Sequence, residues 1–545
     1  MARGAGAALV AELAQNSQRE DPGVHPKLTR TPMSIIVKTA FVAAVLLGVA
    51  ALPPRSSAHA ARAVQAAAYQ PRFQTAACPF KLGAGIVAGR DVRCGYLVVP
   101  EDRSAPAGRS VKLAVAVFKS PAQDRAPDPL VFLQGGPGGA IVGQLGPSID
   151  AQALPIITGR HDFILIDQRG TGYSQPSLAC TELTQLQYAT IDQNLSAKRQ
   201  VTLETQAGKA CHDRLVRAGV NLNAYTTPDD AADVADLRQA LGYATMDLYG
   251  VSYGTRLALT TMRLYPRGLR SVVLDSVVQP QSDNFSDPLR SMRRSFDTLF
   301  QGCAAAAACN KAYPHLDQEF YALVTRLNSK PVSFRVTNSD TGKSYTALLN
   351  GDGLTNLLFQ SLYVTSLIPS LPKMIDDVRR GDYGLAAKAY GLVEFDDSVS
   401  LGMYYAVECS EDAPFTNPGN IEAASRVLPP ALRSDQLISS LGELGQCGTW
   451  TVKKVSSAQK QPVHSPIPTL VLAGQYDPIT PPAHSKAVAT ALSHGYFYQF
   501  PGTGHGVFLT NACPYRITNA FVDDPSHGPD GSCVAGMTGP AFVTK

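Results

Sequence analysis

The chain has 545 residues, of which 45% are hydrophobic and 17% are charged, a composition typical of a globular protein and too apolar for a disordered one. Its net charge is +4; six of the 48 Lys and Arg and three of the 44 Asp and Glu lie in residues 1–60, which leaves 42 basic and 41 acidic residues in the remainder. So balanced a charge excludes the broad basic surface that binds nucleic acids or anionic membranes.

Residues 33–60 have the pattern of a secretory signal peptide. Met33–Lys38 supplies a short basic start, Thr39–Leu52 is an uncharged run of 14 residues, and Ala58–Ala60 has the small-x-small form of a cleavage site. A helix needs about 20 residues to cross a bilayer, so this run is short for an uncleaved membrane anchor, which is the alternative. We therefore predict export, with cleavage near Ala60.

The stretches on either side of this signal are predicted to lie outside the folded core. Residues 1–32 are interpreted as an upstream extension, with Met33 as an alternative start of translation. The Ala-rich stretch 61–75 is predicted to be a linker.

Strand-like and helix-like stretches alternate through the rest of the chain. Helical patterns such as Asp229–Leu241 and Thr255–Leu264 lie between short apolar or alternating runs, an order typical of a largely parallel sheet with helices on both faces. Several runs are apolar throughout, as expected of strands buried on both sides. We predict an α/β fold with a mostly parallel, eight-stranded sheet. The eight runs are Cys94–Pro100, Ser110–Phe118, Pro129–Leu133, Asp162–Asp167, Thr245–Gly250, Leu269–Val278, Pro468–Ala473 and Tyr496–Phe500.

A long insertion interrupts this alternation. About 190 residues separate the sixth and seventh runs, far more than a loop has in a compact domain. Their patterns are mostly helical, as in Leu316–Asn328. We predict a helical cap at 279–461, inserted between two parts of the core at 76–278 and 462–545.

All ten cysteines follow residue 60. An even number confined to the exported part favours disulfides in an oxidising compartment over buried free thiols. No C-x-x-C motif occurs, which argues against a zinc ribbon and against thioredoxin-like chemistry. The sequence does not fix the connectivity, but the spacing favours pairs between neighbours. These pairs are Cys78–Cys94, Cys180–Cys211, Cys303–Cys309, Cys409–Cys447 and Cys513–Cys533.

The sharpest motif is G-x-S-x-G at Gly250–Gly254, directly after an apolar run and directly before a helical pattern. A serine nucleophile on a tight strand-to-helix turn needs small residues two positions before and after it, because larger side chains there would collide. The following helix also directs its first amides at the site, where they favour developing negative charge. We interpret Ser252 as a catalytic nucleophile, with a glycine-rich turn as the alternative.

A nucleophilic serine needs a base, and the base needs an acid that orients it. Where the serine lies on a strand-to-helix turn, the chain order is Ser, acid, His. Asp477 lies in the loop after the seventh run and His505 in a glycine-rich loop after the eighth, so both are expected at the carboxyl edge of the sheet. We predict Asp477 and His505 as the partners of Ser252, with Asp275 at the end of the sixth run as the alternative acid.

The loop Gln134–Gly139 (QGGPGG) ends the third run. Its glycines let backbone amides turn outward, as an oxyanion hole requires, and we predict the amides of Gly136 and Tyr253 as the donors. A phosphate loop is the alternative, but Walker A spacing and G-x-G-x-x-G after the first strand are absent, and Pro137 removes an amide. No H-E-x-x-H or comparable ligand cluster occurs, so we expect neither a metal nor a cofactor.

With these motifs in this order, the chain resembles α/β-hydrolase serine peptidases of the proline iminopeptidase and tripeptidyl aminopeptidase group (peptidase family S33). The resemblance implies a serine exopeptidase with a helical cap and a C-terminal segment of tripeptidyl-aminopeptidase type at about 430–535. Relatives often carry His at the head of the oxyanion loop, where this chain has Gln134. The shared motifs are QGGPGG at 134–139, DQRGTGYS at 167–174, GVSYGTRLA at 250–258, AGQYDPITP at 473–481 and GTGHG at 502–506, with CGYLVVPEDR at 94–103 and ECSED at 408–412.

Acidic residues in the cap are candidates for substrate recognition. An aminopeptidase must bind a free α-amino group, which is protonated near neutral pH, and in similar enzymes acidic cap residues near this position bind it. We predict Glu408 and Glu411 for this role, with a solvated acidic turn as the alternative. Asp167 and Arg169 are interpreted as structural residues that tie neighbouring loops together.

The sequence thus predicts an exported serine exopeptidase, an aminopeptidase of tripeptidyl or prolyl type that acts on short peptides or protein N-termini. An esterase or general acyl hydrolase with the same triad and no amine site is the nearest alternative, because many chemistries share one fold. A non-catalytic exported binding protein is the alternative from another class. No nucleic-acid partner is expected, and no membrane contact beyond the signal peptide.

Overall fold

The computed structural model describes residues 69–339 and 341–545. The predicted upstream extension, the predicted signal peptide and most of the predicted linker lie outside the described residues.

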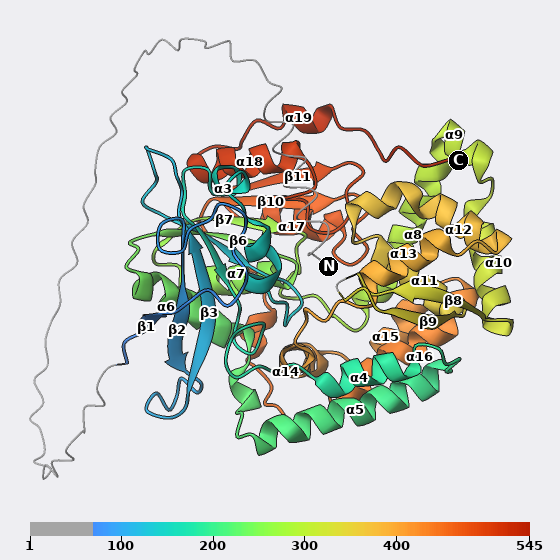
Figure 1. Ribbon diagram of the computed structural model, residues 1–545, viewed down its shortest axis with the longest axis horizontal. Helices are drawn as coiled ribbons and strands as arrows, with labels where there is room; N and C mark the ends of the chain where they lie inside the picture. Colours follow the sequence, from blue (N-terminus) through green and yellow to red (C-terminus); the bar gives the residue numbers. More distant parts are fainter. Residues whose placement is uncertain (1–68, 340) are drawn as a thin grey trace, which may run out of the picture.

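A nine-stranded sheet forms the centre of the core, in the order β1-β2-β3-β5-β4-β6-β7-β10-β11 (Figure 1). Neighbouring strands from β5 to β11 are parallel, whereas the pairs β1–β2, β2–β3 and β3–β5 are antiparallel. The mostly parallel α/β fold predicted from the sequence is therefore confirmed. The strands are β1 (Arg72–Thr75), β2 (Val92–Pro100), β3 (Ser110–Phe118), β4 (Leu130–Leu133), β5 (Phe163–Ile166), β6 (Met246–Val251), β7 (Leu269–Asp275), β10 (Thr469–Gly474) and β11 (Gly495–Phe500).

The prediction of eight strands was wrong by one. The additional strand, β1, falls within the predicted linker and pairs with β2, with Arg72 opposite Val98. It has only four residues, three of them exposed, so no hydrophobic run marks it in the sequence. Backbone pairing at the edge of the sheet is what defines it.

Helices cover both faces of this sheet. Because side chains alternate along a strand, Val131 enters the hydrophobic core on one face and its neighbour Phe132 enters the core on the other. Strands buried on both sides explain the apolar runs of the sequence. The Phe132 face packs against α2 (Val142–Leu145), α3 (Ala153–Thr158) and α18 (Ala512–Asp523), and the Val131 face against α6 (Thr227–Leu241), α7 (Tyr253–Leu264) and α17 (Pro482–Ala491).

The chain between β7 and β10 forms a mainly helical region with a hydrophobic core of its own. It also contains an antiparallel hairpin, β8 (Val332–Thr337) and β9 (Ser344–Leu349), which the helical prediction missed. Its helices are α8 (Asp287–Ala305), α9 (Ala307–Ala312), α10 (Leu316–Ser329), α11 (Gly351–Ser361), α12 (Leu371–Arg380), α13 (Gly384–Val393), α14 (Leu401–Glu411), α15 (Pro418–Ser425) and α16 (Pro430–Gln446).

A helix pair that precedes β6 in the sequence, α4 (Thr181–Thr190) and α5 (Ala197–Arg217), packs against this inserted region (Figure 1). A Cβ at Gly442 of α16 would lie 2.4 Å from Cγ1 of Val201 in α5, so the two helices are in close contact. The amide of Leu348 in β9 donates to the carbonyl that follows α4, that of Ile191 (2.9 Å). The helical region is therefore assembled from two separate stretches of chain.

The C-terminal tail, which follows α19 (Ser532–Ala535), crosses from the core to the inserted region (Figure 1). The amide of Val543 donates to the carbonyl of Pro369 (2.9 Å), and its carbonyl accepts from the Tyr313 hydroxyl (3.0 Å). Phe542 packs against the hydrophobic core of the inserted region. The tail therefore fastens that region to the core.

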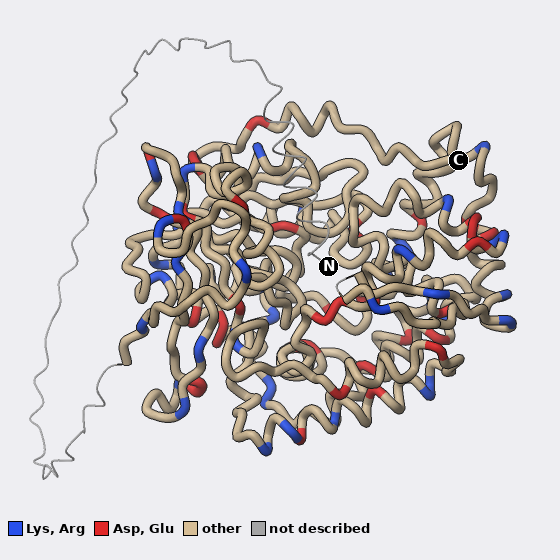
Figure 2. The backbone as a smooth tube through the Cα atoms, viewed as in Figure 1, with Lys and Arg blue, Asp and Glu red and all other residues tan. Residues whose placement is uncertain are grey.

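All ten cysteines form disulfides, and the five pairs are the consecutive ones favoured by their spacing. Five disulfides point to an oxidising, extracellular compartment. In the part of the chain that the structure covers, no helix is both long and apolar enough to cross a membrane. Acidic and basic residues are interspersed along the chain (Figure 2), as their near-equal numbers lead one to expect.

Candidate active site

Ser252 lies on a sharp turn between β6 and α7. Its backbone has φ +57° and ψ −126°, a conformation that residues other than glycine rarely adopt. A Cβ at Gly250 would lie 2.3 Å from the Gly254 carbonyl oxygen, and a Cβ at Gly254 would lie 2.0 Å from the Leu133 carbonyl oxygen. Both glycines are therefore required by the close approach of backbone, and the strand-turn-helix context expected from the sequence is present.

The glycine loop after β4 lies directly against Ser252. A Cβ at Gly135 would lie 2.7 Å from the Cβ of Ser252 and 3.2 Å from its hydroxyl oxygen, so only glycine fits beside the hydroxyl. The next residue, Gly136, has φ +122°, which glycine adopts without strain. The side chain of Gln134 accepts a hydrogen bond from the Gly135 amide (3.0 Å). Gly135 and Ser252 are thus in contact, and the two predicted oxyanion donors, Gly136 and Tyr253, are the residues that directly follow them.

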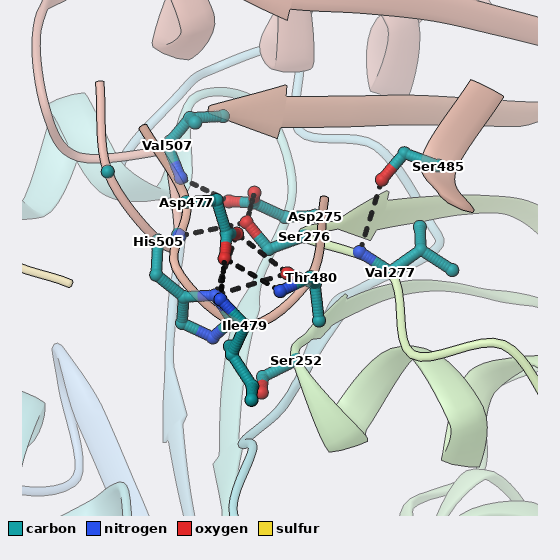
Figure 3. A network of polar contacts seen from close by, with 12 residues as sticks. Ser252, Asp275, Ser276, Val277, Asp477, Ile479, Thr480, Ser485, His505 and Val507 are labelled. Atoms are coloured by element: carbon teal, nitrogen blue, oxygen red, sulfur yellow. Dashed lines mark hydrogen bonds and ion pairs between the residues drawn. The ribbon is translucent and has the colours of Figure 1, made fainter. Parts of the chain in front are cut away.

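His505 is hydrogen-bonded to Asp477. The imidazole Nδ1 lies 2.8 Å from Oδ2 of the carboxylate, which is fully buried (Figure 3). The same oxygen accepts from the Thr480 hydroxyl (2.6 Å), and Oδ1 accepts from the amides of Ile479 (3.0 Å) and Thr480 (2.8 Å). In the view of Figure 3 the His505 ring lies between Asp477 and Ser252. The loops after β10 and β11 therefore bring together the acid and base predicted from the sequence.

The electrostatics of this pair favour an ionised acid and a readily protonated base. Burial penalises the charged form of each group, but the partner outweighs that penalty. The charge and hydrogen bond of Asp477 raise the pKa of His505 above its usual 6.5. The charge and hydrogen bond of His505, together with the Thr480 donors, lower the pKa of Asp477 below its usual 3.8.

Asp275, the alternative acid, bonds to the backbone of the histidine loop. Its Oδ2 accepts from the amides of Val507 (2.7 Å) and Phe508 (3.1 Å) and from the Tyr249 hydroxyl (2.5 Å). Of the two candidates, Asp477 is thus the one in contact with the imidazole.

A family model for the alpha/beta hydrolase fold matches residues 128–512, well over half of the chain. The chain is an alpha/beta hydrolase. Serine protease Hip1 of Mycobacterium tuberculosis is 26% identical to this hydrolase over 465 residues, 81% of this chain and 86% of that protein. Tripeptidyl aminopeptidase of Streptomyces lividans is 31% identical over 201 residues, 36% of this chain and 37% of that protein. Among solved structures, an esterase from Thermogutta terrifontis is 15% identical, with 78% of this chain and 97% of that chain covered and a TM-score of 0.31.

Asp167 and Arg169 stabilise the loops around the site of this hydrolase. Asp167 accepts hydrogen bonds from the amides of Ile141 (2.7 Å) and Val142 (2.9 Å), which lie two and three residues after the glycine loop. Arg169 forms a buried, two-pronged ion pair with Asp233 of α6, with both bonds at 2.7 Å. Their structural interpretation from the sequence agrees with these contacts.

Glu408, Glu411 and Asp412 are all buried, so the alternative of a solvated acidic turn is wrong. Asp412 is paired with Arg256 (2.5 Å) and Lys460 (2.6 Å), and these cations overcome the effect of burial and lower its pKa. It is therefore a structural counter-ion.

Both carboxylate oxygens of Glu411 accept hydrogen bonds from the first residue of α6. It accepts from the amide of Thr227 (2.6 Å) through one oxygen and from the Thr227 hydroxyl (2.7 Å) through the other. Burial raises the pKa of Glu411 to about 6. The predicted role of Glu411 in amine binding therefore competes with an existing contact.

Glu408 has a carboxylate oxygen that is free to accept a hydrogen bond from a ligand. One oxygen accepts from the side-chain amide of Asn284 (2.9 Å), whereas the other is buried with no hydrogen-bond partner among the described residues. Burial and the nearby charge of Asp412 raise the pKa of Glu408 well above its usual value. A buried carboxylate oxygen without a partner is costly, and such a group calls for a ligand or a proton.

Two further carboxylates, Glu443 of α16 and Glu204 of α5, were missed by the sequence analysis. The Tyr404 hydroxyl donates to Glu443, and both Glu443 and Glu408 are close enough to raise the pKa of Tyr404 beyond the effect of burial. Burial, and then the charge of Glu204, raise the pKa of Glu443. Tyr404 also adjoins the glycine loop, since a Cβ at Gly138 would lie 3.4 Å from its amide nitrogen. We call Glu204, Glu408 and Glu443 the acidic cluster.

One group of described residues has the composition of a metal site. The potential ligand atoms of Asp128, His161 and Asp247 all lie within 4.8 Å of one another. Arg270, however, contacts both carboxylates at 2.8 Å and offsets part of their charge. We therefore interpret the group as an ion network.

Proposed function

We propose that this hydrolase is an exported serine exopeptidase of aminopeptidase type, in peptidase family S33. The observation that carries the proposal is the buried carboxylate of Glu408, which has an unbonded oxygen and belongs to the acidic cluster around Tyr404, the residue that adjoins the glycine loop. A protonated α-amino group is the ligand that such a site would take. The similarity to a tripeptidyl aminopeptidase and to serine protease Hip1 supports the same activity.

The chemistry would proceed through an acyl-enzyme. His505 takes the proton of Ser252 as the hydroxyl oxygen attacks a peptide carbonyl near the substrate's N-terminus. Asp477 orients the imidazole and stabilises the imidazolium, while the amides of Gly136 and Tyr253 hold the oxyanion. The imidazolium then gives its proton to the leaving amine. Water, activated by the same base, releases the acyl group from Ser252.

The helical region would act as a cap that makes this chemistry exopeptidic. In the proposal the cap spans residues 279–461, and the core spans 76–278 and 462–545, with a C-terminal segment of tripeptidyl-aminopeptidase type at about 430–535. The amine held at Glu408 fixes one end of the peptide, so the separation between Glu408 and Ser252 sets how many residues are released. The substrates would be short peptides or protein N-termini. The enzyme itself would be exported, with its signal peptide cleaved near Ala60.

Matched fluorogenic peptides with free and acetylated N-termini test the proposal. The chain from about Ala61 is expected to hydrolyse only the free forms, and the length of the released fragment distinguishes a tripeptidyl from a prolyl enzyme. Ser252→Ala is expected to abolish the activity. Equal turnover of acetylated peptides, or activity on simple esters alone, would leave an acyl hydrolase without amine recognition.

Two glutamates of the same helix provide a matched pair of variants. Glu408→Gln removes the carboxyl group that would be ionised against the bound amine, and it is expected to lower kcat/KM for free peptides about 10- to 100-fold, as a lost charged hydrogen bond does. Glu411→Gln removes an equally buried carboxyl group that contacts Thr227, and it is expected to keep the preference for a free N-terminus. Equal losses in both variants would contradict amine binding at Glu408.

A further inference from the structure

Three consecutive backbone amides after His505 are bound by two neighbouring side chains at the end of β7. The amide of Gly506 donates to the Ser276 hydroxyl (2.9 Å), and the amides of Val507 (2.7 Å) and Phe508 (3.1 Å) donate to Oδ2 of Asp275. Figure 3 shows Asp275, Ser276 and Val507 above Ser252, with Val507 on the loop that carries His505. The position of that loop is therefore fixed by side chains outside the Ser-His-Asp set.

The surroundings of Asp275 suit a carboxylate rather than a carboxylic acid. The side chain is fully buried, which raises its pKa. Every group that contacts it donates a hydrogen: the two loop amides, the Tyr249 hydroxyl (2.5 Å) and the Ser276 hydroxyl, which donates to Oδ1 (3.1 Å). Three of these donors meet Oδ2 and one meets Oδ1, and the carboxylate is the form that accepts a hydrogen bond from all four.

Ser276 adopts a backbone conformation that only a specific contact explains. Its φ is +61°, in the left-handed region that favours glycine. In this conformation its hydroxyl both accepts from Gly506 and donates to Asp275, which links the loop to the carboxylate. A strained residue retained between a buried acid and a catalytic loop indicates a positioning function.

We propose that Asp275 and Ser276 are positioning residues for the general base, which hold the backbone after His505 and place a second buried negative charge behind the imidazole. The proposal rests on the proposed role of Ser252 and His505, but it is independent of which acyl substrate the enzyme takes. It divides two tasks between two acids: Asp477 binds the ring, and Asp275 binds the loop.

The other groups around His505 contact its ring or the acid loop, whereas Asp275 contacts the backbone that follows it. Asp477 contacts the ring from the loop after β10, and Tyr363 of the inserted region packs edge-on against it at 4.9 Å between ring centres. Arg294 of α8 donates to the backbone carbonyls of Gln475 and Asp477, in the loop that carries the acid. Asp275 is thus a second anion near the imidazole, and it adds to the effect of Asp477 in raising the pKa of His505.

The test is the rate at which a fluorophosphonate labels Ser252, measured across pH. This probe requires the nucleophile and its base but no peptide, so a failure of the aminopeptidase proposal would leave it unaffected. Asp275→Asn is expected to slow labelling on the order of 10²-fold at the high-pH plateau, the cost of a misplaced catalytic group. It is also expected to move the acidic limb to lower pH, because loss of the negative charge lowers the pKa of His505.

Two matched variants separate loop positioning from charge. Ser276→Gly removes the acceptor for the Gly506 amide in a conformation that glycine favours, so the variant is expected to fold, to label several-fold more slowly and to keep the acidic limb in place. Tyr249→Phe removes a donor from the same carboxylate but keeps its charge and both amide contacts, and should label almost as fast as the wild type. Wild-type labelling rates in both folded Asp275→Asn and Ser276→Gly would overturn the proposal. Should Asp275→Asn fail to fold, an unchanged rate in Ser276→Gly alone would do so.

Discussion

If His505 is the base that activates Ser252, as we propose, its protonation state sets the pH range of activity. Burial disfavours the imidazolium, but the charge and hydrogen bond of Asp477 prevail and raise the pKa of His505 above 6.5. Only the neutral imidazole can accept the serine proton, so kcat/KM is expected to rise with pH through a midpoint above pH 6.5. A pH profile of kcat/KM measures this midpoint, and a value below 6.5 contradicts the expectation.

Asp477→Asn is expected to lower kcat by about 10⁴-fold, because the imidazole loses both its orienting partner and the stabilisation of its charged form. The midpoint of the pH profile should move to lower pH in the same variant, since the pKa of His505 is no longer raised by this charge. Steady-state kinetics with circular dichroism as a folding control decide the matter. A loss under tenfold would point to Asp275 as the functional acid.

Gly135 tests how closely the glycine loop approaches the nucleophile. A Cβ there would lie 2.7 Å from the Cβ of Ser252, so Gly135→Ala is expected to displace the serine and lower kcat/KM on the order of 10²-fold. Gly445→Ala is the control, because nothing lies within 4 Å of a Cβ at this exposed position near the end of α16. It should keep full activity, and equal losses in both variants would refute a specific effect at Gly135.

Among individual site residues, those that lie in sequence motifs could be predicted, whereas those that lie in ordinary helical patterns could not. Ser252, Asp477 and His505 follow strands in a fixed order with glycines around them, and the structure brings them to one edge of the sheet. Glu204 and Glu443 lie in amphipathic helices, where a glutamate is ordinary. They become distinctive only when α5 and α16 pack together and partly bury them, which no local pattern records.

Among the secondary-structure elements, α6 has an N-terminus stabilised by a distant glutamate. Glu411, at the end of α14, accepts from the Thr227 amide and hydroxyl in the first turn of α6. In Glu411→Gln a side-chain NH₂ replaces one acceptor and the charge near the helix start is lost, which is expected to cost about 1–2 kcal/mol of stability. Urea denaturation measures the loss, and an unchanged midpoint would mean that the contact does not stabilise the fold.

The elements missed from the sequence were missed for different reasons. β1 (RFQT) has no hydrophobic pattern, because three of its four residues face solvent and only Phe73 packs against the core. The hairpin strands β8 and β9 do show alternating burial, as in Val332–Thr337, but they are short and lie among long helical patterns. The sequence of β1 therefore has no strand pattern, whereas the sequence of the hairpin has a short one that the surrounding helical patterns obscured.

Over the whole molecule, the C-terminal tail joins the helical region to the core. A chain ending at Gly539 loses the packing of Phe542 and two hydrogen bonds at Val543, each worth about 1 kcal/mol. We expect this truncation to lower the melting temperature and to speed hydrogen exchange around Tyr313 and Pro369, while the sheet stays protected. Unchanged exchange at these two places would show that the tail does not restrain the inserted region.

The five disulfides have a consequence for the synthesis of this chain. Their cysteines are 6 to 38 residues apart, and no loop between two partners contains a cysteine of another pair. If oxidation follows the order in which cysteines leave a translocation channel, each cysteine meets its native partner before any other is available. A thiol oxidase acting on the emerging chain is then sufficient for correct pairing, and no isomerase is needed to repair it. A host that oxidises thiols during export should therefore produce the enzyme in its native form.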